Sequence, residues 1–120
     1  MVTIVLVLVL FTTPAAAAGT TPRVLVDTWC VDDAMTKNTS QDVTFYKRQR
    51  QCKTAEDTLI IAADRMIAAE EVSCKLLEVE AAGGAWRLLH SCRHVSGDHF
   101  VSDAWYSLSD RNTLRVQSGN

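Results

Sequence analysis

The sequence predicts a mostly β protein, a small antiparallel sandwich or barrel of about five to six strands. The glycine pair Gly83-Gly84 is flanked symmetrically by Cys74 and Cys92, as in a hairpin. Apolar and polar residues alternate from residue 72 to residue 117, and turn-forming residues interrupt that alternation at 96–98 and 109–113. Period-two alternation with one apolar face is typical of a half-buried antiparallel sheet.

The first 18 residues are expected to be a signal peptide. An apolar run from Val2 to Phe11 precedes the small residues Ala16, Ala17 and Ala18, and cleavage is expected after Ala18 or nearby. The run is shorter than the roughly 20 residues that span a bilayer. We therefore expect a periplasmic or secreted protein without stable membrane insertion after cleavage. Residues 19–28 would form a flexible N-terminal segment, and residues 29–120 a single disulfide-stapled β domain.

Charge and cysteine content narrow the class of protein. The formal net charge is −2, and acidic and basic residues are interspersed along the chain. We therefore expect no extended basic surface of the kind that binds nucleic acid. The chain has four cysteines. An even number of cysteines in an exported chain indicates disulfides.

The hairpin around Gly83 predicts which cysteines pair. If this turn is tight, residues whose numbers add to 166 face each other, which sets Cys74 opposite Cys92. The same rule gives the pairs Leu76 with His90, Leu77 with Leu89, and Glu80 with Trp86. Directly opposed cysteines are close enough to bridge. Cys30 and Cys52 are then left to form the second disulfide.

The later strands continue this pattern. A turn at 96–98 would oppose Trp86 to Leu108, Leu88 to Tyr106 and His94 to Phe100, and a turn at 109–113 would oppose Leu108 to Leu114 and Tyr106 to Val116. One face would then be apolar: Val72, Cys74, Leu76, Trp86, Leu88, Cys92, Phe100, Ala104, Tyr106, Leu108, Leu114 and Val116.

Residues 54–69 fit two interpretations. The segment is rich in Ala and Glu, and Thr54 could cap a short helix. Alternatively, Thr58–Ala62 and Met66–Glu70 form two short strands. We favour strands because Glu70 and Glu71 fall where a helical stripe would be apolar, and because the following strands need a partner.

Several ordered features resemble a known kind of domain. They are the L-I-I-A-A-D-R stretch at 59–65, Cys74, the Gly-Gly-x-Trp of 83–86 and Cys92, followed by Tyr106, Leu108, Leu114 and Val116. Together with Trp29 and Cys30 they resemble a small exported, cysteine-containing β domain of proteobacterial, notably rhizobial-type, proteins. That resemblance implies an antiparallel β fold and an envelope location. It implies no activity, and no catalytic residue can be carried over.

Two groups of residues have the composition of reactive sites. His90, Cys92 and His94 alternate along one strand and are ligand types that zinc prefers, but a disulfide at Cys92 would remove that sulfur. Ser96-Gly97-Asp98-His99 contains a nucleophile, an acid and a base, but neighbours in a tight turn rarely converge. We expect no catalytic residues, no metal and no cofactor.

The charged clusters favour a structural interpretation. Adjacent carboxylates at Asp32-Asp33 and Glu70-Glu71 would point to opposite faces of a strand, although paired carboxylates can carry acid and base chemistry. The basic stretch 47–50 lies beside two aromatic residues, and such a pattern can track a phosphate backbone. It is short, and we interpret it as a solvated strand end.

Two tryptophans are the candidates for partner contact, Trp105 and Trp29. Trp105 falls on the mixed face of the sheet, where an exposed aromatic ring favours a binding role. We therefore expect a non-enzymatic binding or structural module whose partner is an envelope protein or a small ligand. The alternatives are a small secreted hydrolase and an inhibitor of a lysozyme or protease.

Overall fold

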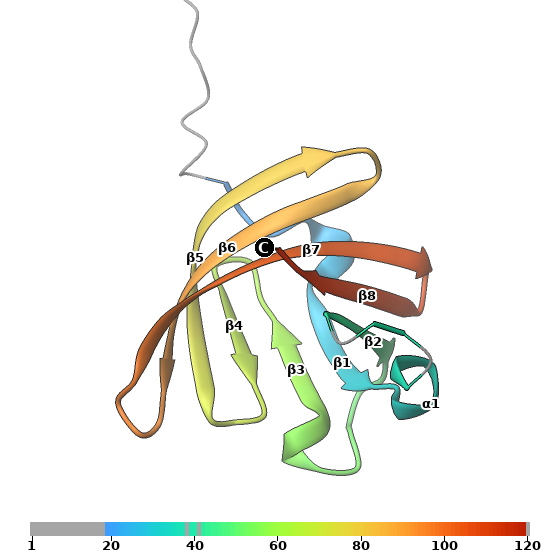
Figure 1. The fold of residues 1–120 in the computed structure, drawn as a ribbon, viewed down its shortest axis with the longest axis horizontal. Coiled ribbons are helices and arrows are strands. Elements are labelled where there is room, and N and C mark those ends of the chain that lie inside the picture. Colours follow the sequence, from blue (N-terminus) through green and yellow to red (C-terminus); the bar gives the residue numbers. More distant parts are fainter. Residues whose placement is uncertain (1–18, 38, 41, 120) are drawn as a thin grey trace, which may run out of the picture.

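The computed structural model describes residues 19–37, 39–40 and 42–119; the expected signal peptide lies outside the described residues. Eight antiparallel strands form a closed barrel in the order β1-β2-β8-β7-β6-β5-β4-β3 (Figure 1). The strands are β1 (Asp27–Val31), β2 (Val43–Arg48), β3 (Thr58–Ile61), β4 (Arg65–Ala68), β5 (Val72–Ala82), β6 (Ala85–His94), β7 (His99–Asp110) and β8 (Thr113–Ser118). The prediction of a mostly β fold is confirmed.

The predicted number of five to six strands is too low, because the sequence pattern indicates no strand between Cys30 and Cys52. That segment contains the end of β1 and all of β2, and these two strands separate β3 from β8 in the barrel. Strands β3 to β8 pair in chain order, and the β1–β2 pair closes the remaining gap through β3 on one side and β8 on the other. Every strand therefore has a neighbour on both sides.

Helical structure is confined to short turns in the described residues. They are η2 (Arg23–Leu25), α1 (Asp33–Thr36) and η3 (Ala55–Asp57). In the ambiguous segment 54–69, a single 3₁₀ turn precedes the two strands β3 and β4, which confirms the two-strand interpretation. Asp32 caps α1 by accepting a hydrogen bond from the backbone N–H of Met35 at 3.1 Å.

The register of the long hairpin is predicted correctly only near the cysteines. Cys74 lies opposite Cys92 and Leu76 opposite His90, but a bulge between Leu76 and Glu78 then shifts the pairing by one residue. Leu89 consequently faces Glu78 instead of Leu77, and Trp86 faces Ala81 instead of Glu80. A bulge places two residues of one strand against one residue of the other.

The next turn lies one residue earlier than predicted. Trp86 opposes Tyr106, Leu88 opposes Ala104 and Cys92 opposes Phe100, so each predicted partner is wrong by two positions. The pairs Leu108 with Leu114 and Tyr106 with Val116 are confirmed. A shift of two preserves the side-chain face, so the error in register does not exchange the inner and outer faces of these strands.

Both predicted disulfides are confirmed. Cys74–Cys92 joins directly opposed residues of β5 and β6, and Cys30–Cys52 ties β1 to the loop that follows β2. None of the described cysteines is free. Disulfides of this kind persist in oxidising compartments.

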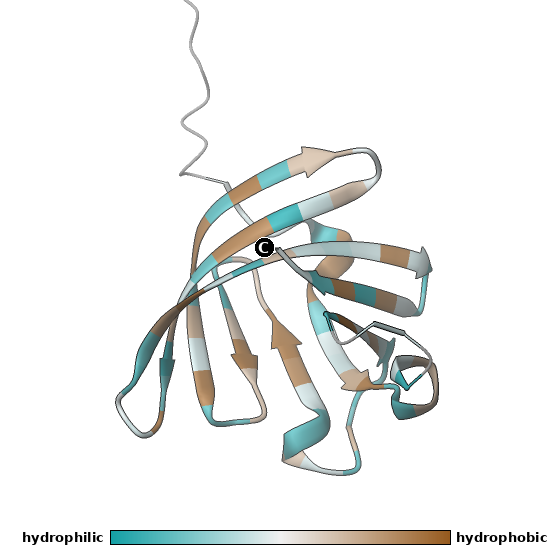
Figure 2. Ribbon diagram, viewed as in Figure 1, coloured by the Kyte–Doolittle hydropathy of each residue, from teal (hydrophilic) through white to brown (hydrophobic). Residues whose placement is uncertain are grey.

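The core fills the barrel and includes more of the N-terminal segment than expected. Its members come from seven strands and from η2: Leu25, Trp29, Leu59, Ile61, Met66, Cys74, Leu88, Cys92, Ala104, Tyr106 and Leu114. Hydrophobic and hydrophilic bands alternate along the strands, for example along β8 (Figure 2). Leu25 is fully buried and β1 begins at Asp27, so packed residues also precede residue 29.

Candidate ligand-binding cavity at the open end of the barrel

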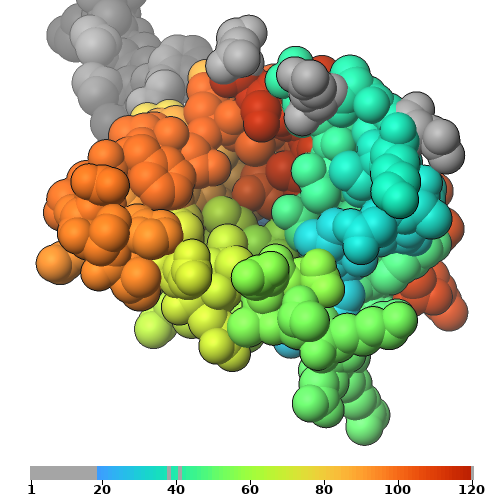
Figure 3. Space-filling view, turned by 60° about the horizontal axis from the view of Figure 1, so that its bottom comes forward, coloured from blue at the N-terminus to red at the C-terminus, as the bar shows by residue number. Residues whose placement is uncertain are grey.

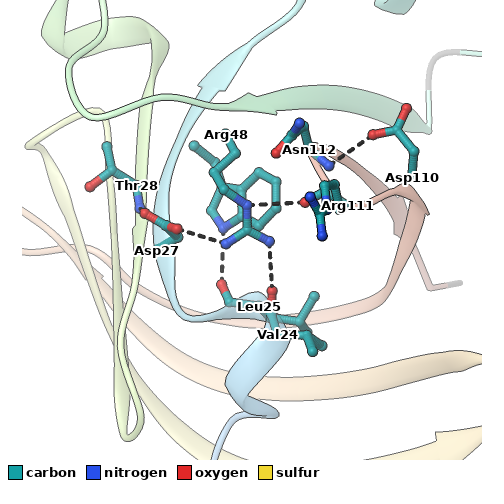
Figure 4. Close-up of polar contacts among 9 residues, drawn as sticks. Val24, Leu25, Asp27, Thr28, Arg48, Asp110, Arg111 and Asn112 are labelled. Atoms are coloured by element: carbon teal, nitrogen blue, oxygen red, sulfur yellow. Dashed lines mark hydrogen bonds and ion pairs between the residues drawn. The ribbon is translucent and has the colours of Figure 1, made fainter.

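One end of the barrel is closed by η2 and the side chain of Arg48. Its guanidinium donates to the carboxylate of Asp27 at 2.6 Å and to the carbonyl oxygens of Val24 and Arg111, both at 3.1 Å (Figure 4). The same group lies over the ring of Trp29, 4.4 Å from its centroid. An arginine that satisfies several backbone oxygens and stacks on an indole holds the capping turn against the barrel.

The opposite end is hollowed. Figure 3 shows a depression ringed by the chain around β4, the start of β7 and the start of β2, with atoms of β8 deep inside it. This cavity of about 420 Å³ is lined from five strands and their ends: Asp42, Thr44, Tyr46, Leu59, Met66, Ala68, Phe100, Val101, Ser102, Asp103, Ala104, Tyr106, Val116, Ser118 and Gly119. Its size falls in the range of small-molecule sites.

Two tyrosines supply phenol groups to this cavity. The hydroxyl of Tyr106 donates to the thioether sulfur of Met66 at 3.4 Å, which is a weak acceptor. The hydroxyl of Tyr46 has no hydrogen-bond partner among the described residues. Burial raises the pKa of both phenols, so both remain protonated donors at neutral pH.

Hydroxyl groups also lie nearer the rim. Thr44, Ser102 and Ser118 line the cavity, and their side chains make no hydrogen bonds within the described part of the chain. Leu59, Ala68, Ala104 and Val116 provide apolar wall between them. An apolar wall with a few unpaired donors suits a molecule that has an apolar body and acceptor atoms.

Phe100 and Val101 extend the apolar surface at the edge of this cavity. They are 46% and 62% exposed, respectively, although Phe100 lies on the apolar face predicted for it. Phe100 opposes Cys92 near the end of the β6–β7 hairpin, where the barrel wall no longer has a facing layer. Its partial exposure follows from that position.

His90 is fully buried inside the barrel between Leu76 and Ser102 on the neighbouring strands. Neither ring nitrogen has a hydrogen-bond partner, and burial lowers the pKa of the imidazole to about 4. The weak metal alternative at His90, Cys92 and His94 is wrong, because the Cys92 sulfur is bonded to Cys74. Among the described residues, no three His, Cys, Asp or Glu side chains are grouped for a metal ion.

The turn after β6 holds a hydrogen-bonded string that was not predicted. His94 Nδ1 lies 2.9 Å from Ser96 Oγ, and its Nε2 lies 3.3 Å from a carboxylate oxygen of Glu71. His99, the base considered from the sequence, instead pairs with Arg93 at the start of β7. The signal that could have found the string is the hairpin register itself, which sets Val72 opposite His94 and so brings Glu71 close to that ring.

This string lacks the remainder of a hydrolytic site. The backbone N–H of Ser96 donates to the same His94 Nδ1 at 3.0 Å, so the ring nitrogen that would accept the serine proton is already used. The neighbouring cavity of about 440 Å³ is lined by Glu71 and His94 but not by Ser96. Because Ser96 does not line a substrate cavity, its hydrogen bonds favour a structural role in the turn rather than a catalytic role.

The two tryptophans occupy different environments. Trp29 is fully buried, and its indole N–H donates to the carbonyl oxygen of Leu25 at 2.9 Å. The expectation of a partner contact at Trp29 therefore does not hold, because the ring is part of the core. Trp105 lies half-buried on the outer face of β7, between Arg87 and Gln117, and its role in binding stays a prediction.

The charged clusters have structural contacts. In the basic stretch, the ammonium of Lys47 donates to Thr113 Oγ1 at 2.7 Å and Arg48 closes the barrel end. On the outer wall, Arg87 forms a two-pronged ion pair with Asp103, at 2.6 and 2.7 Å, which lowers the pKa of that carboxyl group. Glu70 adopts a left-handed backbone conformation in the β4–β5 turn.

Comparison with protein-family models, with curated proteins and with solved structures finds no match to this chain. Within the described residues, no helix has the length and apolar character needed to cross a membrane.

Proposed function

We propose that this chain is an exported, non-enzymatic binding protein of the periplasm or extracellular space, and that the open end of the barrel holds a small amphipathic ligand. The observation that carries this proposal is the unpaired hydroxyl of Tyr46, a residue that lines a cavity of about 420 Å³. The two disulfides support an oxidising location.

The lining defines the kind of ligand. Apolar side chains and the Met66 thioether would enclose a hydrocarbon or aromatic body, and the phenols and rim hydroxyls would donate to oxygen or nitrogen acceptors. The closed end supports this role, because Arg48 and Trp29 hold the barrel shape while the walls of the cavity remain free for binding. A rigid frame around the site reduces the ordering cost of binding.

The test uses the fluorescent probe 1-anilinonaphthalene-8-sulfonate, which combines an aromatic body with acceptor oxygens. We expect saturable binding that Ala68→Leu weakens by at least about tenfold, because added methyl groups occupy the cavity. Tyr46→Phe, which removes one donor, should weaken binding by about 3- to 10-fold, the equivalent of one hydrogen bond.

Ala82→Leu is the matched control, since Ala82 is exposed at the end of β5 and does not line the cavity. Thermal unfolding of each variant confirms that the barrel is intact. Equal probe binding by Ala68→Leu and the wild type would contradict the cavity as the site. Turnover of an ester that disappears in Ser96→Ala would contradict the non-enzymatic assignment.

A further inference from the structure

The outer face of the barrel carries a symmetric arrangement around the Cys74–Cys92 disulfide. The sequence contains Ser-Cys-Lys at 73–75 and Ser-Cys-Arg at 91–93, and the two triplets lie directly opposite each other on β5 and β6. Ser73 faces Arg93, and Lys75 faces Ser91. Because the cysteines point inward, these four side chains point outward.

The flanking strands extend this arrangement by one basic side chain on each side. Arg65 of β4 lies opposite Lys75, and His99 of β7 lies opposite Arg93. The four strands are neighbours in the barrel, as Figure 1 shows. One end of the arrangement thus has Arg65 and Lys75, and the other has Arg93 and His99. The serine hydroxyls lie beside Lys75 and Arg93. An approximate two-fold axis through the disulfide relates the two ends.

These residues share one groove. A depression of about 420 Å³ is lined by all six side chains together with Asp64 and the two cysteines. All six are exposed, and Asp64, which forms an ion pair with Arg65 at 3.3 Å, is the single acidic residue lining it among the described residues. Lys75 and Arg93 form no ion pair or side-chain hydrogen bond within the described part of the chain.

This concentration of positive charge is unfavourable for folding. Like charges directly opposite each other on neighbouring strands destabilise a sheet, and Arg65 and Lys75 are such a pair. The chain as a whole has a net charge of −2, and Glu71 contacts His94 rather than Arg93. An anionic ligand would remove the repulsion.

We propose that this groove binds a molecule carrying two phosphate groups. Each half presents a hydroxyl and a fixed positive charge, and Arg and Lys with hydroxyl donors are the groups that bind phosphate oxygens. Lys75 and Arg93 are diagonal neighbours, which places their Cβ atoms at most about 7–8 Å apart, within reach of two linked phosphates. The disulfide beneath fixes the spacing of the two halves.

The experiment measures binding of inorganic pyrophosphate by calorimetry at low and high salt, and binding to phosphatidylcholine vesicles with and without cardiolipin, a lipid that carries two phosphate groups. We expect saturable binding that the double variant K75E/R93E weakens by at least about tenfold, the equivalent of 1.4 kcal/mol. If pyrophosphate binds in solution and the vesicles do not, the ligand is a soluble phosphate compound. Binding to vesicles alone identifies a lipid headgroup. Either result supports a phosphate site.

The control R50E/K53E changes the net charge by the same amount in the loop that carries Cys52 and should bind like the wild type. K75E/R93E should also unfold at a temperature no lower than the wild type, because the carboxylate introduced at position 75 would face Arg65. Three results would overturn the proposal: no saturable binding to either probe, equal loss in the control, or a lower unfolding temperature for K75E/R93E. The last result would show that these cations serve the fold.

Discussion

Replacing His90 with leucine should remove a large part of the acid sensitivity of the barrel. The imidazole is fully buried, both of its nitrogens lack partners, and burial lowers its pKa from 6.5 to about 4. The neutral form is therefore favoured in the folded state, and the unfolded chain binds the extra proton. The free energy of unfolding therefore decreases as the pH falls from about 6.5 to about 4, because His90 gains its proton more readily in the unfolded chain. The decrease levels off near pH 4.

The size of this effect follows from the two pKa values. Each pKa unit is worth about 1.36 kcal/mol, so the drop from 6.5 to about 4 corresponds to roughly 3 kcal/mol of stability lost between neutral pH and pH 4. No charged residue lies directly opposite His90, since its cross-strand neighbours are Leu76 and Ser102. Leucine has a similar volume and brings no polar atom, so His90→Leu should also be about 1–3 kcal/mol more stable at pH 7.

The assay is urea unfolding of the oxidised wild type and His90→Leu at several pH values between 4 and 7.5. The difference between the two free energies of unfolding should widen toward low pH by about 3 kcal/mol. Carboxylates with lowered pKa, such as Asp27 and Asp103, destabilise both proteins in acid and cancel in that difference. A difference that stays constant across this range would refute the reasoning.

Two further substitutions test other parts of the barrel. Arg48→Ala should lower the free energy of unfolding by about 2–3 kcal/mol, because Asp27 and two carbonyl oxygens lose their donor. Solvent replaces these hydrogen bonds only in part. Arg48→Lys should lower the free energy of unfolding by less. Chemical denaturation would contradict this ordering if the lysine variant were less stable than the alanine variant. Glu70→Gly should stabilise the protein by about 1 kcal/mol, since Glu70 has φ +58°. The control Glu71→Gly should destabilise it, and matching thermal shifts at both positions would rule out backbone strain as the cause.

The hairpin and both disulfides could be predicted because they depend on local signals. Glycines at the turn and one cysteine on each strand define the register between Cys74 and Cys92. The sequence also contains a signal for the bulge that follows. Leu76 and Leu77 break the alternation of apolar and polar residues, and Val79 resumes it on the inner face. A bulge adds one residue to a strand, so a doubled apolar pair within an alternating run is the signal to look for.

The strands β1 and β2 were missed for a different reason. Their outer face is covered, because the Cys30–Cys52 disulfide ties the following loop to β1 and α1 packs on β2 through Thr36 and Phe45. A strand covered on both faces loses the period-two pattern that identifies it. The cavity could not be predicted at all, since it exists only once β2, β3, β4, β7 and β8 surround the same space.

Closure of the barrel limits how a partner can recognise this protein. In the described part of the chain each strand has a hydrogen-bonded neighbour on both sides, but residues 77–82 of β5 and residues 99–102 of β7 are paired with β6 alone. Recognition by strand addition, which depends on backbone geometry and tolerates many sequences, is therefore confined to these two short edges. Over the rest of the barrel a partner must engage side chains, either in the hollows described above or on the outer wall.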